Sequence, residues 1–540
     1  MSGYIPFIVK SVPRVLTQVD RDKHSKTYGC CDRNFWHLKI RDFSSAILQQ
    51  TGLAIALLDT VDFEGNIYYK RNEAEAWAKA TLYYWKKIQL RDGSYNEYYP
   101  NEHGFPPTAF SLFSSCEIYK RLQVYDQNLV EAMTKTGKYL ISHIEKKAYN
   151  QEIASITALY SLYTITNEKW VLEGLESKLR RILDLQSVEG WFPEYGGADI
   201  GYLSVSLDML AEYYWMSRDE RVIEPLNKII EFIKYFIHPD ITVGGEYGSR
   251  NTTYFLPNGI EVMVHLGNKD AIAIKKFILR KSNEPGYFMD AVDDRYYSHY
   301  LLHSFLRALE KEKMNVKPDS NVGLMPFESK EEKYFPEAGL FVLSRMSKEI
   351  SSYCIIGAKK GGVIRTFIDN QQSISDFGYR VNYGEGNIAV TNWQDNDYSV
   401  KKNGNYLEIN GKFTKVSLKM PSPILHLGLR MLSFVFGNKI ISMLKKKIIL
   451  VDKHTDITIS RSIKWDDEKI IIDDKITSPE LIELEAADNF SARHVASGKF
   501  YSISDISIHD ENNYGKNVLF QIHKEIKLDQ INIMSIEVKG

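Results

Sequence analysis

The chain has 540 residues, of which 25% are charged and 44% hydrophobic, and its formal net charge is −1. A chain of this length exceeds what one hydrophobic core usually supports, so we expect at least two domains. The near-zero net charge excludes a general attraction to nucleic acid, and any anionic partner has to be held by local charges. Four cysteines are too few for a disulfide framework, which favours a reducing compartment.

The N-terminal stretch MSGYIPFIVKSVPRVLTQVDRD lacks the basic start and the apolar run of a secretory signal. We therefore expect the protein to be cytoplasmic.

From about Phe43 to Ala308, apolar residues recur at helical spacing, and turn-forming residues interrupt them. Helices joined by short turns form antiparallel hairpins. The spacing predicts an (α/α) toroid of such hairpins over residues 1–315. The clearest helical stretches are AEAWAKATLYYWKKIQ, TAFSLFSSCEIYKRL, NLVEAMTKTGKYLISHI, SITALYSLYTI, VLEGLESKLRRILDLQ, LSVSLDMLAEYYWMS and VIEPLNKIIEFIKYFI.

Two loops within this region repeat a pattern 97 residues apart, beginning at Gln89 and at Gln186. The shared pattern is Q-x-x-[DE]-G-x-[FY]-x-E-Y, with a predicted helix before and after it. A period of this length corresponds to two hairpins, which predicts a curved array whose equivalent loops open on one cleft. A repeat retained only for packing is the alternative, but packing gives no reason for the acidic residues of both loops.

The residues around 316–333 lose the helical period and become polar, which indicates a linker. Beyond them, over residues 334–540, shorter segments alternate Val, Ile, Thr and Tyr at period two between turn residues, as expected for an antiparallel β-sandwich. Lys359 and Lys360, just before two glycines, predict a hairpin turn with a solvated charge pair. The expected strands include GLFVLSR, SSYCIIGAKKG, GNIAVTNW, NYLEINGKF, KIILVDKH, DITISRSIKW, KIIIDDKIT, VLFQIHKEI and NIMSIEVKG. The predicted fold class is therefore multidomain α + β.

The most apolar region, Ile424 to Val451, carries Arg430, Asn438, Lys439 and a run of lysines at 445–447, so it does not read as a membrane-spanning helix. We expect a helical insertion near 424–447. It is either a core insertion or an interfacial segment that rests on an anionic membrane with its lysines at the headgroups. The second interpretation predicts peripheral contact with the inner face of the membrane.

Several common catalytic motifs are missing from the sequence. GxxxxGK[ST], a strand-linked GxGxxG, HExxH, a CxxC pair and a GxSxG elbow do not occur. This excludes nucleotide-binding, zinc-protease and serine-esterase interpretations. No ligand spacing argues for a metal site, and we expect no cofactor.

Three loops carry residues suited to an acidic sugar, because Asn, Arg and His hold a carboxylate and Tyr stays neutral until it is activated. The C5 proton of a hexuronate is weakly acidic, since its removal spreads charge onto a carboxylate that must be neutralised. A positioned Tyr can take that proton while a Tyr or His protonates the oxygen leaving C4, which is β-elimination. The candidate residues are Asn101, Glu102, His103, Trp191, Tyr195, Asp199, Tyr202, Glu246, Tyr247, Arg250 and Asn251.

The helical-hairpin half, the strand-rich half, the Asn-x-His loop and the E-Y-G-G-A-D-x-G-Y loop before a helical Tyr together resemble the heparinase II/III-like polysaccharide lyases and their alginate-lyase relatives. The resemblance implies an (α/α) toroid against a β-sandwich, an active cleft between them, and cleavage of uronate glycans by elimination. It also implies that Asn101 and His103 neutralise the carboxylate, that Tyr202 is the catalytic tyrosine, and that His494 in RHVASGKF supplies the β-domain histidine.

Structural alternatives exist for these residues. His103 suits a turn at a helix start, and Tyr202 suits the first buried position of its helix. Glu102 and Asp199 suit caps of the following helices. Trp191 suits either sugar stacking or a plug within its hairpin.

Three other functions fit the same residues. An inverting glycoside hydrolase would use Glu102 and Asp199 as its carboxylate pair. A uronate C5-epimerase would share the proton abstraction and return the proton to the opposite face. A non-catalytic glycan-binding protein of exopolysaccharide biosynthesis would bind without turnover. In each case the expected partner is an anionic polysaccharide or oligosaccharide, and nucleic acid is not expected.

Overall fold

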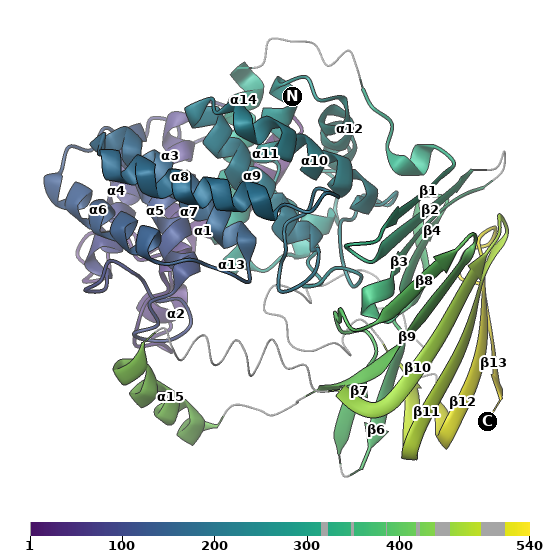
Figure 1. Ribbon diagram of the computed structural model, residues 1–540. Helices are drawn as coiled ribbons and strands as arrows, with labels where there is room; N and C mark the ends of the chain where they lie inside the picture. Colours follow the sequence, from purple (N-terminus) through teal and green to yellow (C-terminus); the bar gives the residue numbers. More distant parts are fainter. Residues whose placement is uncertain are drawn as a thin grey trace.

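The computed structural model describes residues 2–314, 322–346, 350–384, 386–416, 422–437, 454–487 and 513–539. Its N-terminal half is helical and its C-terminal half consists of antiparallel sheets (Figure 1). This arrangement confirms the predicted order of a helical domain followed by a β domain.

Six helices form a closed ring in which each contacts the next and the last contacts the first. They are α3 (Thr51–Thr60), α5 (Phe105–Arg121), α7 (Tyr149–Thr166), α9 (Ile200–Ser217), α11 (Asn258–His265) and α14 (Leu302–Met314). Ring helices such as α3 and α9 are buried on nearly every side, which matches their almost continuous apolar sequence. The ring confirms that the helical hairpins close on themselves.

An outer layer of helices packs on this ring. Its members bury a single apolar stripe, as α8 does with Val171, Leu175, Leu179 and Ile182. The outer helices are α1 (Ile5–Leu16), α4 (Asn72–Lys87), α6 (Gln127–Ser142), α8 (Lys169–Leu185), α10 (Ile223–Ile233) and α12 (Lys269–Leu279), with α2 (Arg33–Trp36) and α13 (Asp294–Tyr296) as short additional turns.

The repeated loops have equivalent geometry. Gly93 has φ +93°, and a Cβ there would lie 2.4 Å from the carbonyl oxygen of Lys135 in α6. Gly190 has φ +104°, and its Cβ would lie 2.2 Å from the carbonyl oxygen of Lys228 in α10. The glutamine that opens each loop donates its amide to a carbonyl of the same outer helix. Both glycines therefore allow a close approach of loop to helix that no other residue permits.

The smaller sheet has the order β1-β2-β3-β4-β5, and all its pairs are antiparallel. Its strands are β1 (Glu331–Phe335), β2 (Leu340–Met346), β3 (Ser351–Gly357), β4 (Val363–Ile368) and β5 (Gln371–Asp376). Because β1 starts at Glu331, the sheet begins inside the predicted linker of 316–333.

The larger sheet contains eight strands. They are β6 (Tyr379–Tyr383), β7 (Asn387–Val390), β8 (Ser399–Asn403), β9 (Tyr406–Val416), β10 (His454–Trp465), β11 (Lys469–Ala486), β12 (Asn513–Lys527) and β13 (Met534–Lys539). Strand β10 pairs with both β9 and β11. The predicted strands that fall in the described ranges are confirmed. The pairing of β10 with β11 joins two strands that are also connected through β9, β7 and β6, so these five strands form a closed circuit. The predicted sandwich therefore stays a prediction.

The smaller sheet is the middle layer of the molecule, between the helices and the larger sheet (Figure 1). Leu340 and Val342 of β2 join the core of the helical domain, while Phe341 and Leu343 join the core shared with the larger sheet. The alternation of side chains along a strand explains this division. Both faces of β2 are buried, so the two halves of the chain pack directly against each other.

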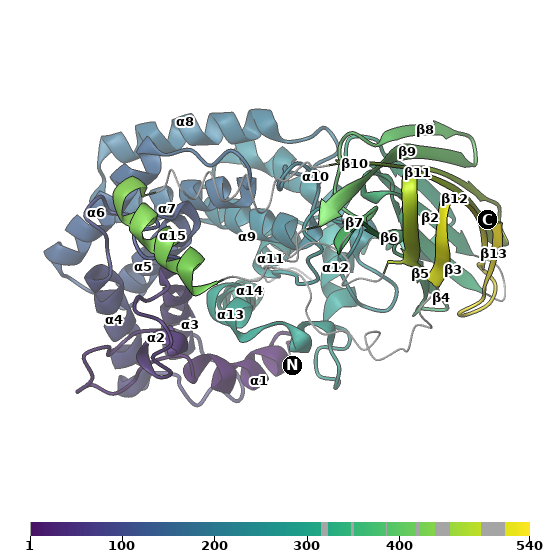
Figure 2. The same cartoon turned by 90° about the horizontal axis from the view of Figure 1, so that it is seen from below.

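Helix α15 (Pro423–Phe436) follows β9 in the chain but belongs to neither the ring of helices nor the sheets. In Figure 1 it lies below α2, and in Figure 2, which is seen from below, it lies in front of the helical domain. The first part of the predicted insertion is therefore helical, and its remainder, from residue 438, lies outside the described residues. Across the described ranges no helix has both the length and the apolar content that crossing a bilayer requires.

Candidate active site

Five tyrosines, Tyr98, Tyr202, Tyr254, Tyr296 and Tyr300, gather at one end of the ring, and we call them the tyrosine cluster. The Tyr202 and Tyr254 rings lie edge to face with their centroids 6.0 Å apart, and Tyr254 lies 5.3 Å from Tyr296. Tyr98 joins the cluster through its electrostatic effect on Tyr296 and Tyr300. Tyr98 is 44% exposed and Tyr202 is partly exposed, whereas the other three are buried. Tyr98 and Tyr202 are thus the two members of the cluster with side-chain surface exposed to solvent, although the charge of Glu97 and burial raise the pKa of the Tyr98 phenol.

A π-helical turn, Tyr297–Leu301, builds part of this cluster. Such turns are rare and frequently occur at functional sites. Here the turn places His299 against Tyr296 and Tyr300, with ring centroids 4.8 Å and 4.1 Å away. Burial lowers the pKa of His299 well below its ordinary value, and the charge of Arg295 acts in the same direction. His299 is therefore uncharged at neutral pH.

A triad of Glu194, Tyr195 and Arg250 lies beside Tyr202. The second repeated loop contributes the glutamate and the tyrosine, and the arginine comes from a later loop. The Arg250 guanidinium carbon lies 4.5 Å from the centre of the Tyr195 ring. Arg250 is buried, and the charges that act on it include those of Tyr195, Tyr202 and Glu194. A buried cation beside a phenol favours the ionised form of that phenol.

The first repeated loop forms an equivalent triad. The Arg295 guanidinium carbon lies 4.9 Å from the centre of the Tyr98 ring, and Nη2 of Arg295 lies 2.5 Å from Oε1 of Glu97. The predicted repeat therefore recurs in three dimensions, because each Glu-Tyr pair meets an arginine from another part of the ring. Glu97 and Glu194 both act electrostatically on Tyr300. The two loops thus converge on the same cluster.

Glu194, the acid of the Arg250 triad, is buried. Asn150 Nδ2, at the start of α7, donates to Oε2 of Glu194 over 2.6 Å. Burial raises the pKa of Glu194 well above its usual range, although the Arg250 cation acts against this. Among the described residues, Oε1 of Glu194, Oδ1 of Asn150 and Nε of Arg250 are buried without a hydrogen-bond partner. Buried polar atoms are normally paired, so three unpaired ones together indicate a place where a polar ligand or water binds.

Asp199 and Glu102, the acids at equivalent positions of the repeat, both hold backbone. Oδ1 of Asp199 accepts from the Tyr202 amide at the start of α9, and Oδ2 accepts from the Arg250 amide over 2.9 Å. Oε2 of Glu102 accepts from three consecutive amides, those of residues 97–99. Burial raises the pKa of Glu102 to about 7, and the neighbouring Glu97 adds to the effect. Asp199 is therefore the N-cap of α9, which agrees with the structural alternative considered for it. Glu102 does not cap the following helix but stabilises the loop that contains it.

Asn101 and His103 lie where the first loop meets α15. Nδ1 of His103 lies 2.6 Å from Oδ2 of Asp92 and 2.8 Å from Oγ of Ser94. Burial opposes ionisation of Asp92, but the hydrogen bonds from His103 and Ser94 hold its pKa well below its usual value. Both Asn101 and His103 have positive φ, 58° and 52°. The His103 side chain thus contacts Asp92 and Ser94, and its expected role at a sugar carboxylate stays a prediction.

The third loop with candidate residues, GGEYGSRNTTYF at 244–255, forms the junction between the helical domain and the smaller sheet. Oε2 of Glu246 lies 3.4 Å from Nη1 of Arg365, and Oδ1 of Asn251 accepts from Nζ of Lys360 over 2.8 Å. Burial lowers the pKa of Lys360 to about 8. The prediction of a solvated lysine pair is therefore wrong for Lys360, which is 2% exposed because it reaches into this loop.

Trp191 and Tyr247 are buried. Nε1 of Trp191 donates to Oε2 of Glu189, and the carboxylate of Glu189 accepts from the amides of residues 337 and 338 in the β domain. The Tyr247 hydroxyl lies 2.7 Å from Nε2 of His238. Trp191 thus plugs its hairpin at the domain junction, and Tyr247, 1% exposed, offers no surface to a sugar.

His494 lies outside the described residues. Several residues of the site were not among the sequence candidates, and Tyr98, Asn150 and Arg295 are three of them. The repeat contained the signal for Tyr98, because it is the partner of Tyr195 in the shared pattern. Asn150 and Arg295 carry no local signal, since they lie 44 and 198 residues from the glutamates that they contact.

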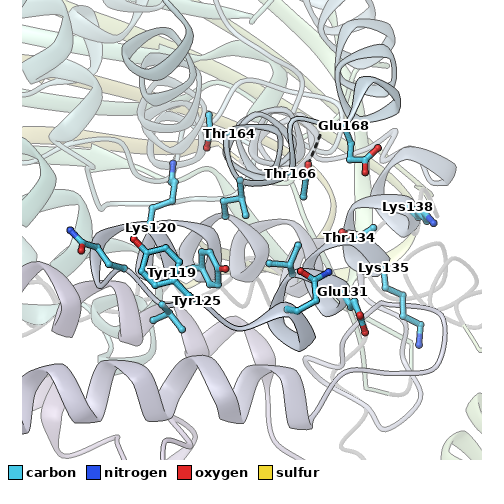
Figure 3. Close-up of a pocket in the computed structure, with 15 residues that line it drawn as sticks. Tyr119, Lys120, Tyr125, Glu131, Thr134, Lys135, Lys138, Thr164, Thr166 and Glu168 are labelled. Carbon is cyan, nitrogen blue, oxygen red and sulfur yellow. Dashed lines mark hydrogen bonds between the residues drawn. The ribbon is translucent and has the colours of Figure 1, made fainter.

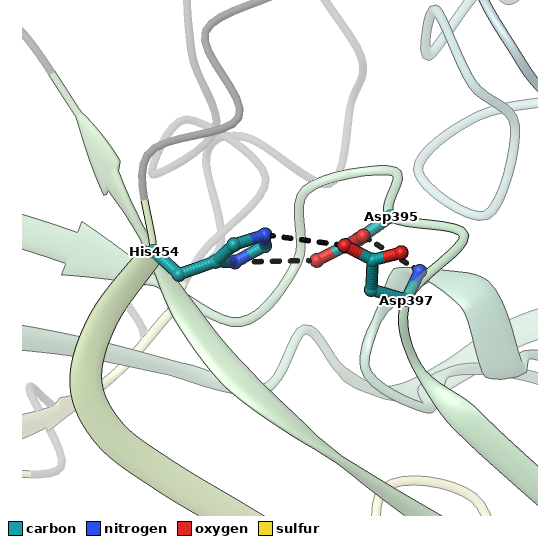
Figure 4. Close-up of side chains that lie close together, drawn as sticks. All are labelled: Asp395, Asp397 and His454. Atoms are coloured by element: carbon teal, nitrogen blue, oxygen red, sulfur yellow. Dashed lines mark hydrogen bonds and ion pairs between the residues drawn. The ribbon is translucent and has the colours of Figure 1, made fainter.

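One group of side chains has the composition of a metal site. Ligand atoms of Asp395, Asp397 and His454 all lie within 4.8 Å of one another (Figure 4). Nδ1 of His454 is 3.5 Å from Asp395, and Nε2 is 3.6 Å from Asp397, which are also the distances of ordinary ion pairs. The same turn contacts the second repeated loop, because Asn396 donates to the Gly196 carbonyl over 3.0 Å.

A pocket of about 900 Å³ opens on the outer side of the helical domain (Figure 3). Its walls include tyrosine, lysine and glutamate side chains, among them Tyr119 near the end of α5, Lys135 of α6 and Glu168, which precedes α8. The residues of the tyrosine cluster are not among its lining residues.

Comparison with solved structures places the fold among polysaccharide lyases. A xanthan lyase from Paenibacillus has a TM-score of 0.52 at 12% identity, over 89% of this chain and 46% of its own. A chondroitin AC lyase from Streptomyces coelicolor A3, in complex with chondroitin sulphate, has a TM-score of 0.53 at 10% identity, over 89% of this chain and 67% of its own. Neither a family model nor a curated protein matches the sequence. The chain spans less than half of the xanthan lyase, and at these identities the likeness is one of fold.

Proposed function

We propose that this protein is a polysaccharide lyase that cleaves a uronate-containing glycan by β-elimination. The observation that carries the proposal is the position of Tyr202. It is a partly exposed member of the tyrosine cluster, it packs against Tyr254, and it interacts electrostatically with the buried Arg250 cation. The fold shared with solved polysaccharide lyases supports it, and the sequence resemblance narrows the proposal to the heparinase II/III-like lyases.

In the proposed reaction, the charge of Arg250 stabilises the uronate carboxylate, and the ionised Tyr202 phenol removes the C5 proton. Asn150 contributes indirectly, because it holds Glu194 beside Arg250. Charge that develops on the carboxylate is stabilised by donors already in place, and such preorganised donors usually supply most of the rate enhancement in reactions of this kind. The electron pair left at C5 forms the C4–C5 double bond as the C4–O bond breaks. The departing oxygen takes a proton from a phenol, either Tyr202, which has just gained one, or the exposed Tyr98.

Glu102 and Asp199, the carboxylate pair that an inverting hydrolase would use, both accept hydrogen bonds from the backbone. Asp199 caps α9 and holds the Arg250 amide, and Glu102 holds three amides of its own loop. A carboxylate committed to backbone donors is a poor general acid or base. This favours elimination over inverting hydrolysis.

The experiment that tests the proposal is a panel of uronate polymers assayed for the ultraviolet absorbance of an unsaturated product. We expect absorbance to rise with at least one polymer. A folded protein that leaves every polymer unchanged, yet retains binding when Tyr202 is replaced by Phe, would support a non-catalytic glycan-binding protein instead.

A further inference from the structure

Helix α15 has its polarity reversed relative to an ordinary surface helix. The side that contacts the body is polar: Arg430 forms a two-fold ion pair with Asp42, at 2.5 Å and 3.0 Å, and Ser433 Oγ donates to the Pro100 carbonyl over 3.1 Å. Gly437 follows at helical spacing and lies against His103, 3.3 Å away from the position of its missing Cβ. A helix of a soluble domain normally turns its apolar stripe inward.

The apolar side chains of α15 face solvent. Ile424 is 84% exposed, Phe434 79%, Val435 69%, Met431 67% and Leu427 63%. The adjoining loop after α2, which ends at Asp42, adds two more exposed apolar side chains, at residues 38 and 40. Exposed apolar side chains gathered on one helix and the loop beside it mark a surface that binds another apolar phase.

The charged residues in the sequence around α15 indicate which kind of surface the helix binds. Between Glu408 and Asp452 the sequence contains eight Lys or Arg residues and no Asp or Glu, in a chain whose total charge is −1. Of those in the described ranges, Lys412 and Lys415 lie on β9, and Arg430 lies on α15 and pairs with Asp42. An apolar helix within a stretch of sequence whose charged residues are all cationic matches an anionic lipid surface, where apolar side chains enter the acyl boundary and cations bind headgroups. An acidic glycan would use the cations but would leave the apolar side chains in water.

We propose that α15 is a membrane-docking helix that lies flat in the surface of an anionic bilayer. Its 14 residues form a helix of about 21 Å, which is shorter than the hydrocarbon core, so it rests in the interface and does not span it. The helix contacts the loop of residues 100–103, so docking brings the first repeated loop to the bilayer. This inference is independent of the proposed lyase reaction.

The test is flotation of the full chain with vesicles of phosphatidylcholine, alone or mixed with phosphatidylglycerol. We expect the protein to float with the anionic vesicles, less so at high salt, and to stay in solution with the neutral ones. The variant Phe434→Glu with Val435→Glu should lower flotation at least tenfold. The matched control is Ile67→Glu with Val188→Glu, which changes two residues that are 70% and 79% exposed elsewhere on the helical domain, and it should float as the unmodified protein does.

Three results would overturn the inference: failure of the unmodified protein to float with anionic vesicles, equal flotation of the two double variants, or self-association without vesicles that only the α15 variant abolishes. The last result would assign the surface to a second copy of the chain. Turnover of soluble oligosaccharides, measured on the same preparations, keeps failure of docking distinct from failure of the lyase reaction.

Discussion

At the scale of single residues, the hydroxyl of Tyr202 is the atom on which the proposed chemistry depends. Tyr202→Phe should lower kcat about a hundredfold or more and change KM little, because the hydroxyl acts in the transition state. Tyr214→Phe removes a hydroxyl from the far end of the same helix and serves as the control. Steady-state kinetics on the best polymer measure both. Equal activity of the two variants would remove Tyr202 from the reaction.

Glu102 makes a prediction about pH. Its pKa rises from 4.5 to about 7 on folding, so the folded protein holds this proton more tightly than the unfolded chain. The associated stability, on the order of 3 kcal/mol, is full below about pH 4.5 and is lost as pH rises through about 7. Glu102→Gln should therefore lose less stability than the unmodified protein between these two pH values. Denaturant unfolding measures the difference, and the exposed Glu173→Gln should leave the pH dependence unchanged.

At the scale of elements, the repeat predicts which glycines are irreplaceable. Gly93→Ala and Gly190→Ala place a Cβ within 2.4 Å of a helix carbonyl at positive φ, and each should lower stability by at least about 2 kcal/mol. Gly267 has φ +80° but no atom within 4 Å of its Cβ position, so Gly267→Ala should cost only about 1 kcal/mol. Melting temperatures of the three variants test the order. Equal losses would mean that the loops do not press on the outer helices.

Elements with clear periodicity were predictable from the sequence, and the exceptions have physical causes. Helix α1 contains Pro13, a residue that ordinarily indicates a helix end. Strand β4 is buried along its whole length, so the alternation that identifies a strand is absent. Within the site, Tyr202 and Arg250 followed from local patterns. Asn150 and Arg295 did not, because only closure of the ring brings them to the glutamates of distant loops.

At the scale of the whole molecule, Lys360 connects the β domain to the Arg250 loop. Lys360→Met leaves Oδ1 of Asn251 and the Gly248 carbonyl without this donor, which should cost about 1–3 kcal/mol and lower turnover by displacing the loop. The neighbouring Lys359→Met is the control, since Nζ of Lys359 donates to the Glu337 carbonyl within the β domain and not to the Arg250 loop. Thermal unfolding and kcat measure both effects, and identical behaviour of the two variants would contradict them.

The mass of the products formed in ¹⁸O-labelled water tests the central claim most directly. Elimination adds no water, so we predict that the fragments sum to the mass of the polymer segment, carry no label, and include an unsaturated uronate. Fragments heavier by one labelled water would establish hydrolysis and contradict the proposed role of Tyr202. An uncleaved polymer that exchanges its C5 proton with solvent would show epimerisation and would likewise contradict β-elimination.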